Sequence, residues 1–249
     1  MNLLAFDGVT LAPERLATAK RYFLRHYHGP FRPDQGTEQI LSTLRRYAPA
    51  GTWLDLGSGP STLLWSIALS DITSISCSDV CPEMLAVLYS FIQSDEVPAC
   101  YRDVLQMLGK NEEHLAEMRR RVQKYLIIDA LMPWHGTLTT ETYDLVTEFG
   151  CFGLASSAES FVACVGYAKL AVRPGGTLIG ANWIRSAALV AREGRPNNYL
   201  SIDLVGRSAE MHRMRLICNE HVIIKNDLDY DAVIIWAMER TKKGGADVF

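Results

Sequence analysis

The sequence predicts an α/β protein built around a mostly parallel sheet. From residue 53 onward, apolar runs of strand length alternate with helical patterns, which is typical of parallel strands joined by right-handed crossovers. A glycine-containing loop, WLDLGSGPST at residues 53–62, follows the first of these runs. Two apolar runs around a turn-bearing centre at residues 222–239 predict a closing antiparallel hairpin.

Hydrophobic periodicity and breaker residues set the expected elements in order. Two helices, at residues 13–27 and 33–47, precede the sheet and are separated by HGPFRP. Further helices are expected at residues 61–68, 82–92, 112–125 and 157–172, and after residue 203 as far as about residue 215. Strands are expected at residues 53–56, 73–78, 125–129, 143–150 and 175–183, before the hairpin. The helix at residues 112–125 carries an arginine run, which we interpret as a solvated face rather than a nucleic-acid site.

Length and composition favour one domain that acts on small molecules. The 249 residues are 48% hydrophobic, enough to bury a full core, and the formal net charge is -3. Lysine and arginine are spread thinly, so neither nucleic acid nor an anionic membrane is an expected partner. We expect a single domain at residues 1–249, with an N-terminal helical lid at 1–48 and a core with acceptor-site insertions at 49–249. The expected assembly is a monomer or a weak homodimer.

Cysteine and histidine usage indicates a reduced compartment and no metal site. The six cysteines form no C-x-x-C pair, and the histidines show no metal-ligand spacing. No apolar stretch reaches the roughly 18 residues of a membrane span. The first eight residues have no cationic flank followed by a long apolar region. A cytoplasmic protein is expected.

The glycine loop is poorly suited to a pyrophosphate. Pro60 removes a backbone N–H donor, and Thr62 stands where a dinucleotide loop has its third glycine. Asp55, two residues before the first glycine, adds negative charge that would oppose NAD or ATP and favour a cationic ligand. S-adenosylmethionine is cationic at its sulfonium and ammonium groups and carries no phosphate. Gly57 and Gly59 would let the backbone, including Ser58 between them, run against its amino-acid end.

Two further strands also end in an acidic residue, as the first strand ends next to this loop. Asp79, which ends the second strand and precedes Val80, lies where adenosine-binding α/β folds place the carboxylate that accepts from the ribose hydroxyls. Asp129 ends the third strand, where it can accept from the adenine amino group while the Ala130 N–H faces a ring nitrogen. Each acid alone could be a strand-end or cap residue. Three acids at three strand ends favour the ligand role.

These motifs resemble one family. The stretches LDLGSGPS, SDV, the arginine-rich helix leading into IIDALMPW, and LAVRPGGTLIGANW match, in order and spacing, the small-molecule N-methyltransferases of the nicotinamide, phenylethanolamine and thioether (indolethylamine) group, over roughly residues 18–240. The resemblance implies a Rossmann-like class I methyltransferase fold with a mostly parallel seven-stranded sheet, a C-terminal antiparallel hairpin and an N-terminal helical cover. It also implies S-adenosylmethionine as cofactor and S-adenosylhomocysteine as product.

The resemblance assigns further residues to the cofactor site. RYFLRHY resembles the cover of that family, in which two tyrosines five residues apart close over cofactor and acceptor, and these are Tyr22 and Tyr27 here. Without the resemblance, both tyrosines could equally be helix-packing residues. Met84 stands where family members often have asparagine, so one polar contact to the cofactor is missing or is supplied by Cys81.

The acceptor side departs from the family pattern. Gly153 stands near where amine-specific members have an acid, and Asn182 stands where the nicotinamide-specific enzyme has one, so nicotinamide is not an implied substrate. Glu148 and Tyr27 are the predicted catalytic residues, with Glu148 also at the cofactor site. Glu148 would remove a proton from a protonated amine or a hydroxyl, although it could equally bond loop N–H groups. His26 and His28 are alternative proton acceptors.

The predicted acceptor contacts are Tyr22, Asn182 and Arg185. Arg185 would hold an anionic or strongly hydrogen-bond-accepting group of the acceptor, with help from Asn182, whereas Arg192 and Arg195 are expected to face solvent. The predicted function is methyl transfer to a small molecule, with nitrogen favoured, in specialised metabolism. Methylation of oxygen, sulfur or carbon on the same fold, and a non-catalytic cofactor-binding regulator, are the alternatives.

Overall fold

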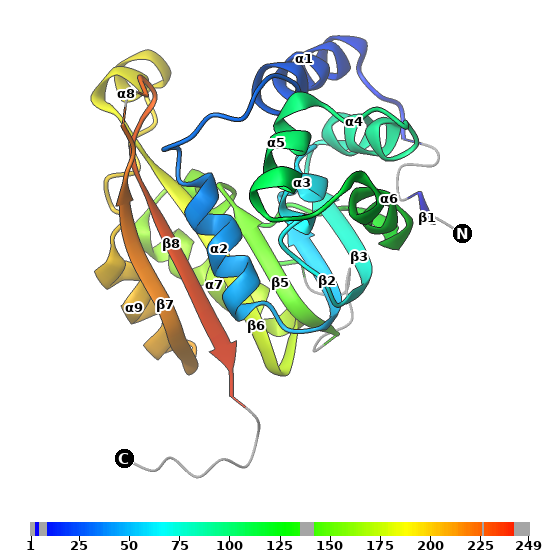
Figure 1. Ribbon diagram of the computed structural model, residues 1–249. Coiled ribbons are helices and arrows are strands. Elements are labelled where there is room, and N and C mark those ends of the chain that lie inside the picture. The colour runs from blue at the N-terminus through cyan, green and yellow to red at the C-terminus, as the bar shows by residue number, and fades with distance from the viewer. Residues whose placement is uncertain (1–2, 5–8, 135–141, 226, 242–249) are drawn as a thin grey trace.

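Eight strands form one sheet in the order β1-β4-β3-β2-β5-β6-β8-β7 (Figure 1), among the residues that the computed structural model describes, namely 3–4, 9–134, 142–225 and 227–241. The strands are β1 (Leu3–Leu4), β2 (Gly51–Leu56), β3 (Ile72–Asp79), β4 (Val122–Ile127), β5 (Tyr143–Phe149), β6 (Val172–Arg185), β7 (Met214–Ile223) and β8 (Tyr230–Arg240). The ends of the predicted domain, residues 1–2 and 242–249, lie outside the described range.

The strand pairing confirms the predicted fold class. From β1 through β6 all neighbouring strands are parallel, and β8 runs antiparallel to both β6 and β7. Without the two-residue strand β1 at the edge, the other seven strands, counted in chain order, lie in the order 3-2-1-4-5-7-6. This is the mostly parallel seven-stranded sheet with a C-terminal antiparallel hairpin, to which β1 adds a short edge.

Helices cover both faces of the sheet. They are α1 (Pro13–Phe23), a π-helical turn η1 (Leu24–His28), α2 (Thr37–Tyr47), α3 (Thr62–Ser66), α4 (Pro82–Ile92), α5 (Ala99–Met107), α6 (Glu112–Arg121), a 3₁₀ turn η2 (Phe152–Leu154), α7 (Ala158–Ala171), α8 (Ala187–Glu193) and α9 (Ile202–Met211). Polar N-cap side chains fix the first residue of the four helices α6, α7, α8 and α9. Each side chain accepts a hydrogen bond from the backbone N–H three residues further on, and the caps are Asn111, Ser157, Ser186 and Ser201.

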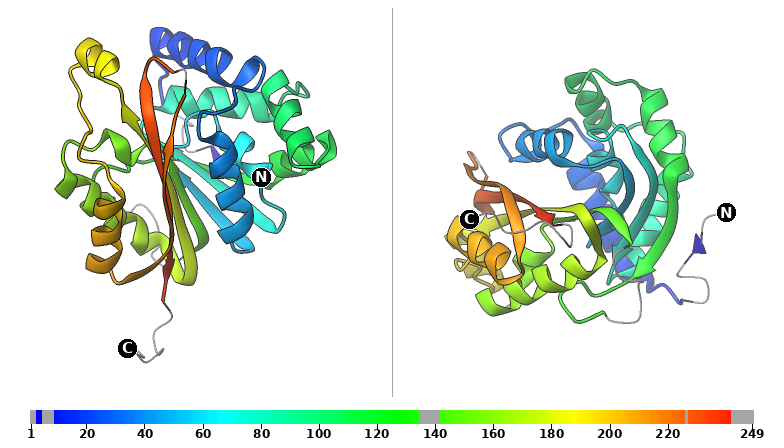
Figure 2. Two further views of the ribbon diagram at one scale, coloured as in Figure 1. Left: turned by 60° about the vertical axis from the view of Figure 1, so that its left-hand side comes forward. Right: turned by 90° about the horizontal axis from the view of Figure 1, so that it is seen from below.

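Alternation along the buried strands divides the core into two layers. In β2, Trp53 packs into the cluster formed with α2 to α6, whereas its neighbour Leu54 packs into the cluster formed with α7 and α9. Strand β8 does the same with Ile235 and Trp236. Figure 2 shows the resulting arrangement, a twisted sheet between two helical layers.

The carboxyl ends of the parallel strands lie together at one end of the sheet. This is the end at which α/β folds bind ligands. The helix α1 lies at this end and packs on α4, and α8, which directly follows β6, lies there too (Figure 1). The chain therefore places its N-terminal helical segment and its α8 segment around the loops that end β2, β3, β4 and β5.

Several predicted boundaries were wrong. The helix expected at residues 112–125 ends at Arg121, and the next residues already form β4. The helix expected to end near residue 215 ends at Met211, and β7 begins at Met214, earlier than the predicted hairpin. The helix expected from residue 33 begins at Thr37, because Gly36 adopts φ of 84° in a left-handed turn.

Candidate functional site

The glycine loop after β2 is held by the acid that ends β3. Gly57 and Gly59 have φ of 60° and 50°, a left-handed conformation that glycine adopts readily. Asp79 accepts from the Gly59 N–H through Oδ2 at 2.9 Å and from the Cys81 N–H through Oδ1 at 2.8 Å. The Ser58 N–H donates to a carbonyl of β3 at 2.8 Å. The structure therefore brings Gly57, Ser58, Gly59 and Asp79 together.

Asp79 keeps acceptor capacity for a ligand. Loss of hydration raises the pKa of its half-buried carboxyl, and the backbone hydrogen bonds from Cys81 and Gly59 lower it. A carboxylate offers about four acceptor positions, and the two backbone bonds use two of them. The remaining positions suit the paired hydroxyls of a ribose.

Asp55 lies beneath the loop rather than at its surface. Its side chain is 1% exposed, and it accepts from the hydroxyls of Thr62 and Thr147, both at 2.7 Å. Burial raises its pKa to about 7, against the lowering effect of the two threonine hydrogen bonds. Thr62 itself is fully buried and turned toward Asp55, so its hydroxyl supports the loop from below.

The ends of β3 and β4 expose apolar side chains beside polar ones. Val80 is 59% exposed and Met132 is 58% exposed. Just before Met132 in the chain come exposed Asp129, whose Oδ1 accepts from the Leu131 N–H at 3.0 Å, and buried Ala130. Large exposed apolar side chains next to a strand-end acid suit a flat heterocycle with a polar edge, as adenine is. Met132 was not predicted, because an apolar residue in the loop after a strand gives no distinct signal in the sequence.

The two predicted lid tyrosines lie together next to the loop. The rings of Tyr22 and Tyr27 are 6.0 Å apart, and their hydroxyls are hydrogen-bond partners. Burial raises the pKa of Tyr27 well above its usual value, against a hydrogen bond with Ser61 that lowers it. Tyr22 is 40% exposed, but its hydroxyl is shielded from water, which raises its pKa, as does the nearby Asp79. Met84 packs, half-buried, against the same core cluster as Tyr27.

The N-terminal segment is fastened to the core at three points outside the tyrosine pair. Hydrogen bonds join the Ala12 N–H to Glu83 Oε1 (2.8 Å), His28 Nε2 to Glu96 Oε1 (2.8 Å) and the Phe31 N–H to Asp103 Oδ2 (2.9 Å). These bonds reach α4, the connection after α4, and α5. The segment between the anchors carries both tyrosines.

Glu148 and Asn182 form a buried network on the other face of the sheet. Glu148 is fully buried, and its Oε2 accepts from the Phe152 N–H at 3.0 Å and from Asn182 Nδ2 at 3.1 Å. Asn182, 1% exposed, also accepts from the indole N–H of Trp236 at 3.2 Å. The other oxygen of Glu148 is buried without a hydrogen-bond partner, on the side where Gly180 lacks a side chain.

This geometry argues against two predicted roles. Burial raises the pKa of Glu148 well above its usual value, against the lowering effect of its two hydrogen bonds. Glu148 has no exposed surface, and burial disfavours its charged form, so it is unsuited to take a proton from an acceptor. The Asn182 amide is 1% exposed and bonds to Glu148 and Trp236 inside the protein, so it has no exposed group for its expected contact with the acceptor.

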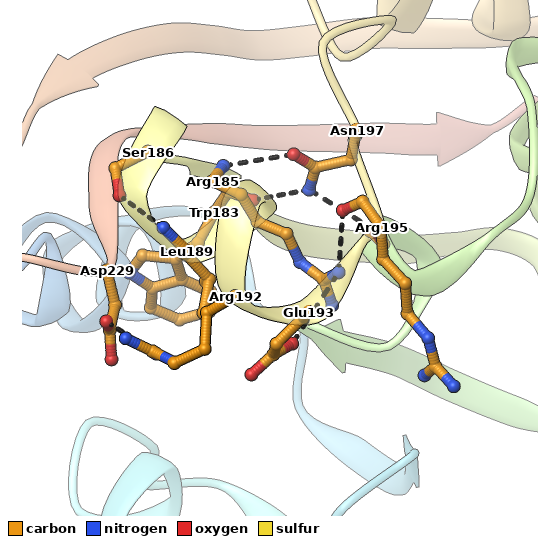
Figure 3. Close-up of polar contacts among 10 residues, drawn as sticks. Trp183, Arg185, Ser186, Leu189, Arg192, Glu193, Arg195, Asn197 and Asp229 are labelled. Atoms are coloured by element: carbon orange, nitrogen blue, oxygen red, sulfur yellow. Dashed lines mark hydrogen bonds and ion pairs between the residues drawn. The ribbon is translucent and has the colours of Figure 1, made fainter.

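Three arginines, Arg185 at the end of β6 and Arg192 and Arg195 after it, lie around α8 (Figure 3). Arg185 Nη1 donates to the Arg195 carbonyl at 2.8 Å and lies 3.9 Å from Glu193 Oε2. Arg192 pairs with Asp229 at 2.8 Å and is more than half exposed, and the Arg195 side chain is exposed. Arg192 and Arg195 lie as the sequence predicted, at the surface, whereas the Arg185 side chain is nine-tenths buried.

Metal ligands and membrane spans can be assessed only over the described part of the chain. There, no three histidine, cysteine or acidic side chains lie close enough together to hold a metal ion. Over the same residues, no helix is both long and apolar enough to span a bilayer.

Comparison with known structures identifies the fold. No protein-family model matches the chain, and no curated protein matches its sequence. Among solved structures, the N-methyltransferase NodS from Bradyrhizobium japonicum, in complex with S-adenosylhomocysteine, matches with a TM-score of 0.57 and 14% identity, over 90% of this chain and 97% of that one. The chain has the class I methyltransferase fold.

Two further structures share this architecture. An S-adenosylmethionine-dependent methyltransferase from Aquifex aeolicus matches with a TM-score of 0.52 and 15% identity, over 93% of this chain and 100% of that one. A chain of a Haloferax volcanii complex between a methyltransferase activator and a methyltransferase matches with a TM-score of 0.61 and 13% identity, over 93% and 100%. The narrower resemblance to the nicotinamide, phenylethanolamine and indolethylamine enzymes stays a prediction.

Gly57→Ala is expected to destabilise the protein more than Gly59→Ala. Both glycines have left-handed backbones, which cost another residue about 1–2 kcal/mol. A Cβ on Gly57 would also lie 2.6 Å from Cys151 Cβ and 2.7 Å from its sulfur, whereas a Cβ on Gly59 would meet nothing within 4 Å. Thermal unfolding of both variants measures the difference, and Cys151→Gly should partly restore Gly57→Ala. Equal losses of Tm in the two variants would contradict this packing.

Proposed function

We propose that this protein transfers a methyl group from S-adenosylmethionine to a nitrogen atom of a small molecule in specialised biosynthesis. The observation that carries the proposal is Asp79, held by the glycine loop in a class I methyltransferase fold, with acceptor positions left for a ribose. The loop itself is unsuited to a pyrophosphate, because Pro60 lacks an N–H and Thr62 fills the position of a third glycine.

The residues of this chain would bind and orient the reactants rather than take part in bond making. S-adenosylmethionine supplies a methyl carbon already activated by positive sulfur. Asp79 would accept from the ribose, while Val80 and Met132 would flank the adenine and Asp129 would accept from its amino group. Tyr22 and Tyr27 would close over the reacting groups and exclude water. Cofactor and acceptor would thereby be held in line for transfer.

Neither predicted catalytic residue offers a strong base, which favours nitrogen as the acceptor atom, while His26, whose ring lies 4.6 Å from that of Tyr22, is the base that an oxygen acceptor would use. A neutral amine has a lone pair ready for methyl transfer, whereas a hydroxyl needs its proton removed. Glu148 is fully buried, and Tyr27 has a raised pKa, so neither is suited to that step. One structure of similar fold is described as an N-methyltransferase. Oxygen, sulfur and carbon acceptors remain the alternatives.

Two measurements test the proposal. Calorimetry should detect binding of S-adenosylmethionine and S-adenosylhomocysteine, but not of ATP or NAD, which carry the phosphates that the loop disfavours. A methyl-release assay should then find turnover on amines within a metabolite panel. Failure to bind S-adenosylmethionine would overturn the proposal, while binding without turnover on any panel member would favour a non-catalytic regulator.

The N-terminal segment is expected to become more ordered when both ligands bind. Residues 18–32 carry the two tyrosines, follow the anchor at Ala12 and include the anchors at His28 and Phe31. A segment that closes over bound ligands commonly gates turnover. Hydrogen exchange should show increased protection there with S-adenosylhomocysteine and a methyl acceptor, while α7, on the other face of the sheet, should change little. Unchanged protection of residues 18–32 would exclude a lid.

A further inference from the structure

Arg185 occupies an unusual place for an arginine. It is the last residue of β6, and its side chain is only 9% exposed. It pairs across the sheet with Tyr230 of β8, and the rings of Tyr230 and Trp183 are 6.4 Å apart. Long charged side chains are rarely buried to this degree unless they are paired. A nine-tenths buried guanidinium therefore calls for a partner.

The partners within the described part of the chain leave most of the guanidinium available. One hydrogen bond goes from Nη1 to the Arg195 carbonyl, and the same nitrogen lies 3.9 Å from Glu193 Oε2, beyond hydrogen-bond distance. Glu193 is itself 45% exposed, so this ion pair is weak. A guanidinium carries five N–H donors. In contrast, Arg192 makes a full 2.8 Å pair with Asp229 at the surface.

The backbone around Arg185 is fixed. Asn197, which is 4% exposed, accepts from the Arg185 N–H at 3.0 Å. Its amide nitrogen donates to the Trp183 carbonyl at 2.8 Å and to the Gly153 carbonyl at 3.3 Å. Asn197 thus ties the chain after α8 to the end of β6 and to η2, as Figure 3 shows in part. The guanidinium is presented from a rigid base, which favours a specific ligand.

Tyr230 links Arg185 to the lid tyrosine Tyr22. Burial raises the pKa of Tyr230, Tyr22 raises it further, and Arg185 lowers it, so both groups lie near the Tyr230 hydroxyl. Tyr22 in turn lies near Asp79 at the glycine loop. Tyr230 therefore connects Arg185 with the tyrosine that lies next to the glycine loop.

We propose that Arg185 binds a carboxylate of the methyl acceptor, in a site completed by Tyr230 and Trp183 and held in place by Asn197. This inference rests on the proposed methyltransferase function and names its substrate class, a small amine that also carries a carboxylate. The planar fork of Arg185 matches a carboxylate in bidentate geometry. Glu193 is the weak counter-ion that the incoming carboxylate replaces, and the apolar part of the acceptor lies against Trp183 and Tyr230.

Matched probes test the site without requiring turnover. Calorimetry of the full chain, with and without S-adenosylhomocysteine, measures the binding of three pairs: glycine and glycinamide, 4-aminobenzoate and 4-aminobenzamide, and indole-3-acetate and indole-3-acetamide. At least one carboxylate should bind 10-fold or more tightly than its amide. Equal binding within every pair, or no binding by any probe, overturns the inference.

Three variants assign the preference to Arg185. Arg185→Met should abolish the carboxylate preference while leaving S-adenosylhomocysteine affinity within twofold, and Arg192→Met is the matched control that should keep the preference. Glu193→Gln removes the competing carboxylate and should tighten carboxylate binding severalfold, a gain that does not depend on whether Arg185→Met folds. A preference that survives Arg185→Met, or that is unchanged in Glu193→Gln, contradicts the site.

Failure of this inference is distinguishable from failure of the proposed function. Normal S-adenosylmethionine binding and turnover of amines that lack a carboxylate would remove the carboxylate site and leave the methyltransferase proposal intact. Selective carboxylate binding by a protein that does not bind S-adenosylmethionine would keep the carboxylate site and overturn the methyltransferase proposal.

Discussion

Asp79→Ala is expected to weaken S-adenosylmethionine binding by about 1–3 kcal/mol, because the ribose hydroxyls lose a charged acceptor. This corresponds to a rise in Kd of roughly 5-fold to 150-fold. Calorimetry measures it directly. The variant also removes the acceptor for the Gly59 and Cys81 N–H groups, so some of the loss would come from a loosened loop.

A ligand change separates the two contributions. Analogues of S-adenosylhomocysteine that lack the 2′- or 3′-hydroxyl should bind the native protein more weakly than S-adenosylhomocysteine does. In Asp79→Ala the penalty for removing a hydroxyl should largely disappear, because its acceptor is already gone. If the penalty is the same in both proteins, Asp79 acts only on the loop, and its assignment to the ribose is wrong.

Asp55 should make the free energy of unfolding decrease as the pH rises from 4 to 7. Its pKa is about 7 in the folded protein, chiefly because it is buried, against an ordinary value of 3.8. Below about pH 4 the carboxyl is protonated in both states, so its full contribution to stability is present. Between pH 4 and 7 the unfolded chain loses the proton while the folded protein keeps it, so stability falls. The difference between the two pKa values corresponds to about 4 kcal/mol.

Asp55→Asn provides the comparison, because Glu148 also has a raised pKa and contributes to the pH dependence in the same direction. The amide has the shape of the carboxyl and can exchange hydrogen bonds with the hydroxyls of Thr62 and Thr147. Urea unfolding of both proteins across this range should show the native protein losing stability relative to the variant. A constant difference from pH 4 to 7 would show that Asp55 titrates at its ordinary pKa.

Local pattern was sufficient to predict the sheet, because each central strand is a short apolar run bounded by loop residues. It failed where a helix passes directly into a strand. Arg121 and Val122 are consecutive, and the arginine run with the residues after it continues a helical pattern although those residues pair in β4. Strand β7 was missed in part because it lies at an edge of the sheet, with exposed residues such as Arg215 and Glu220, so its apolar signal is weak.

The sequence predicted those residues of the candidate site that lie directly at the carboxyl ends of parallel strands. Asp79 and the glycines lie together because parallel strands end at one edge, a rule that needs no tertiary detail. Glu148 also ends a strand, but whether such an acid faces a ligand or the core depends on which face of the sheet it joins. Asn197 could not be found from sequence, because its three hydrogen bonds connect segments that only the fold brings together.

The π-helical turn at Leu24–His28 affects how this chain should be aligned with other sequences. In an uninterrupted α-helix, residues five apart point about 140° away from each other. The widened turn accommodates one extra residue, and the rings of Tyr22 and Tyr27 lie 6.0 Å apart. A one-residue deletion between them would restore an ordinary helix and still keep two aromatic side chains. Gaps of a single residue in this segment therefore carry functional information: a homologue that aligns without one keeps its tyrosines five residues apart, whereas a homologue with the deletion has them four apart.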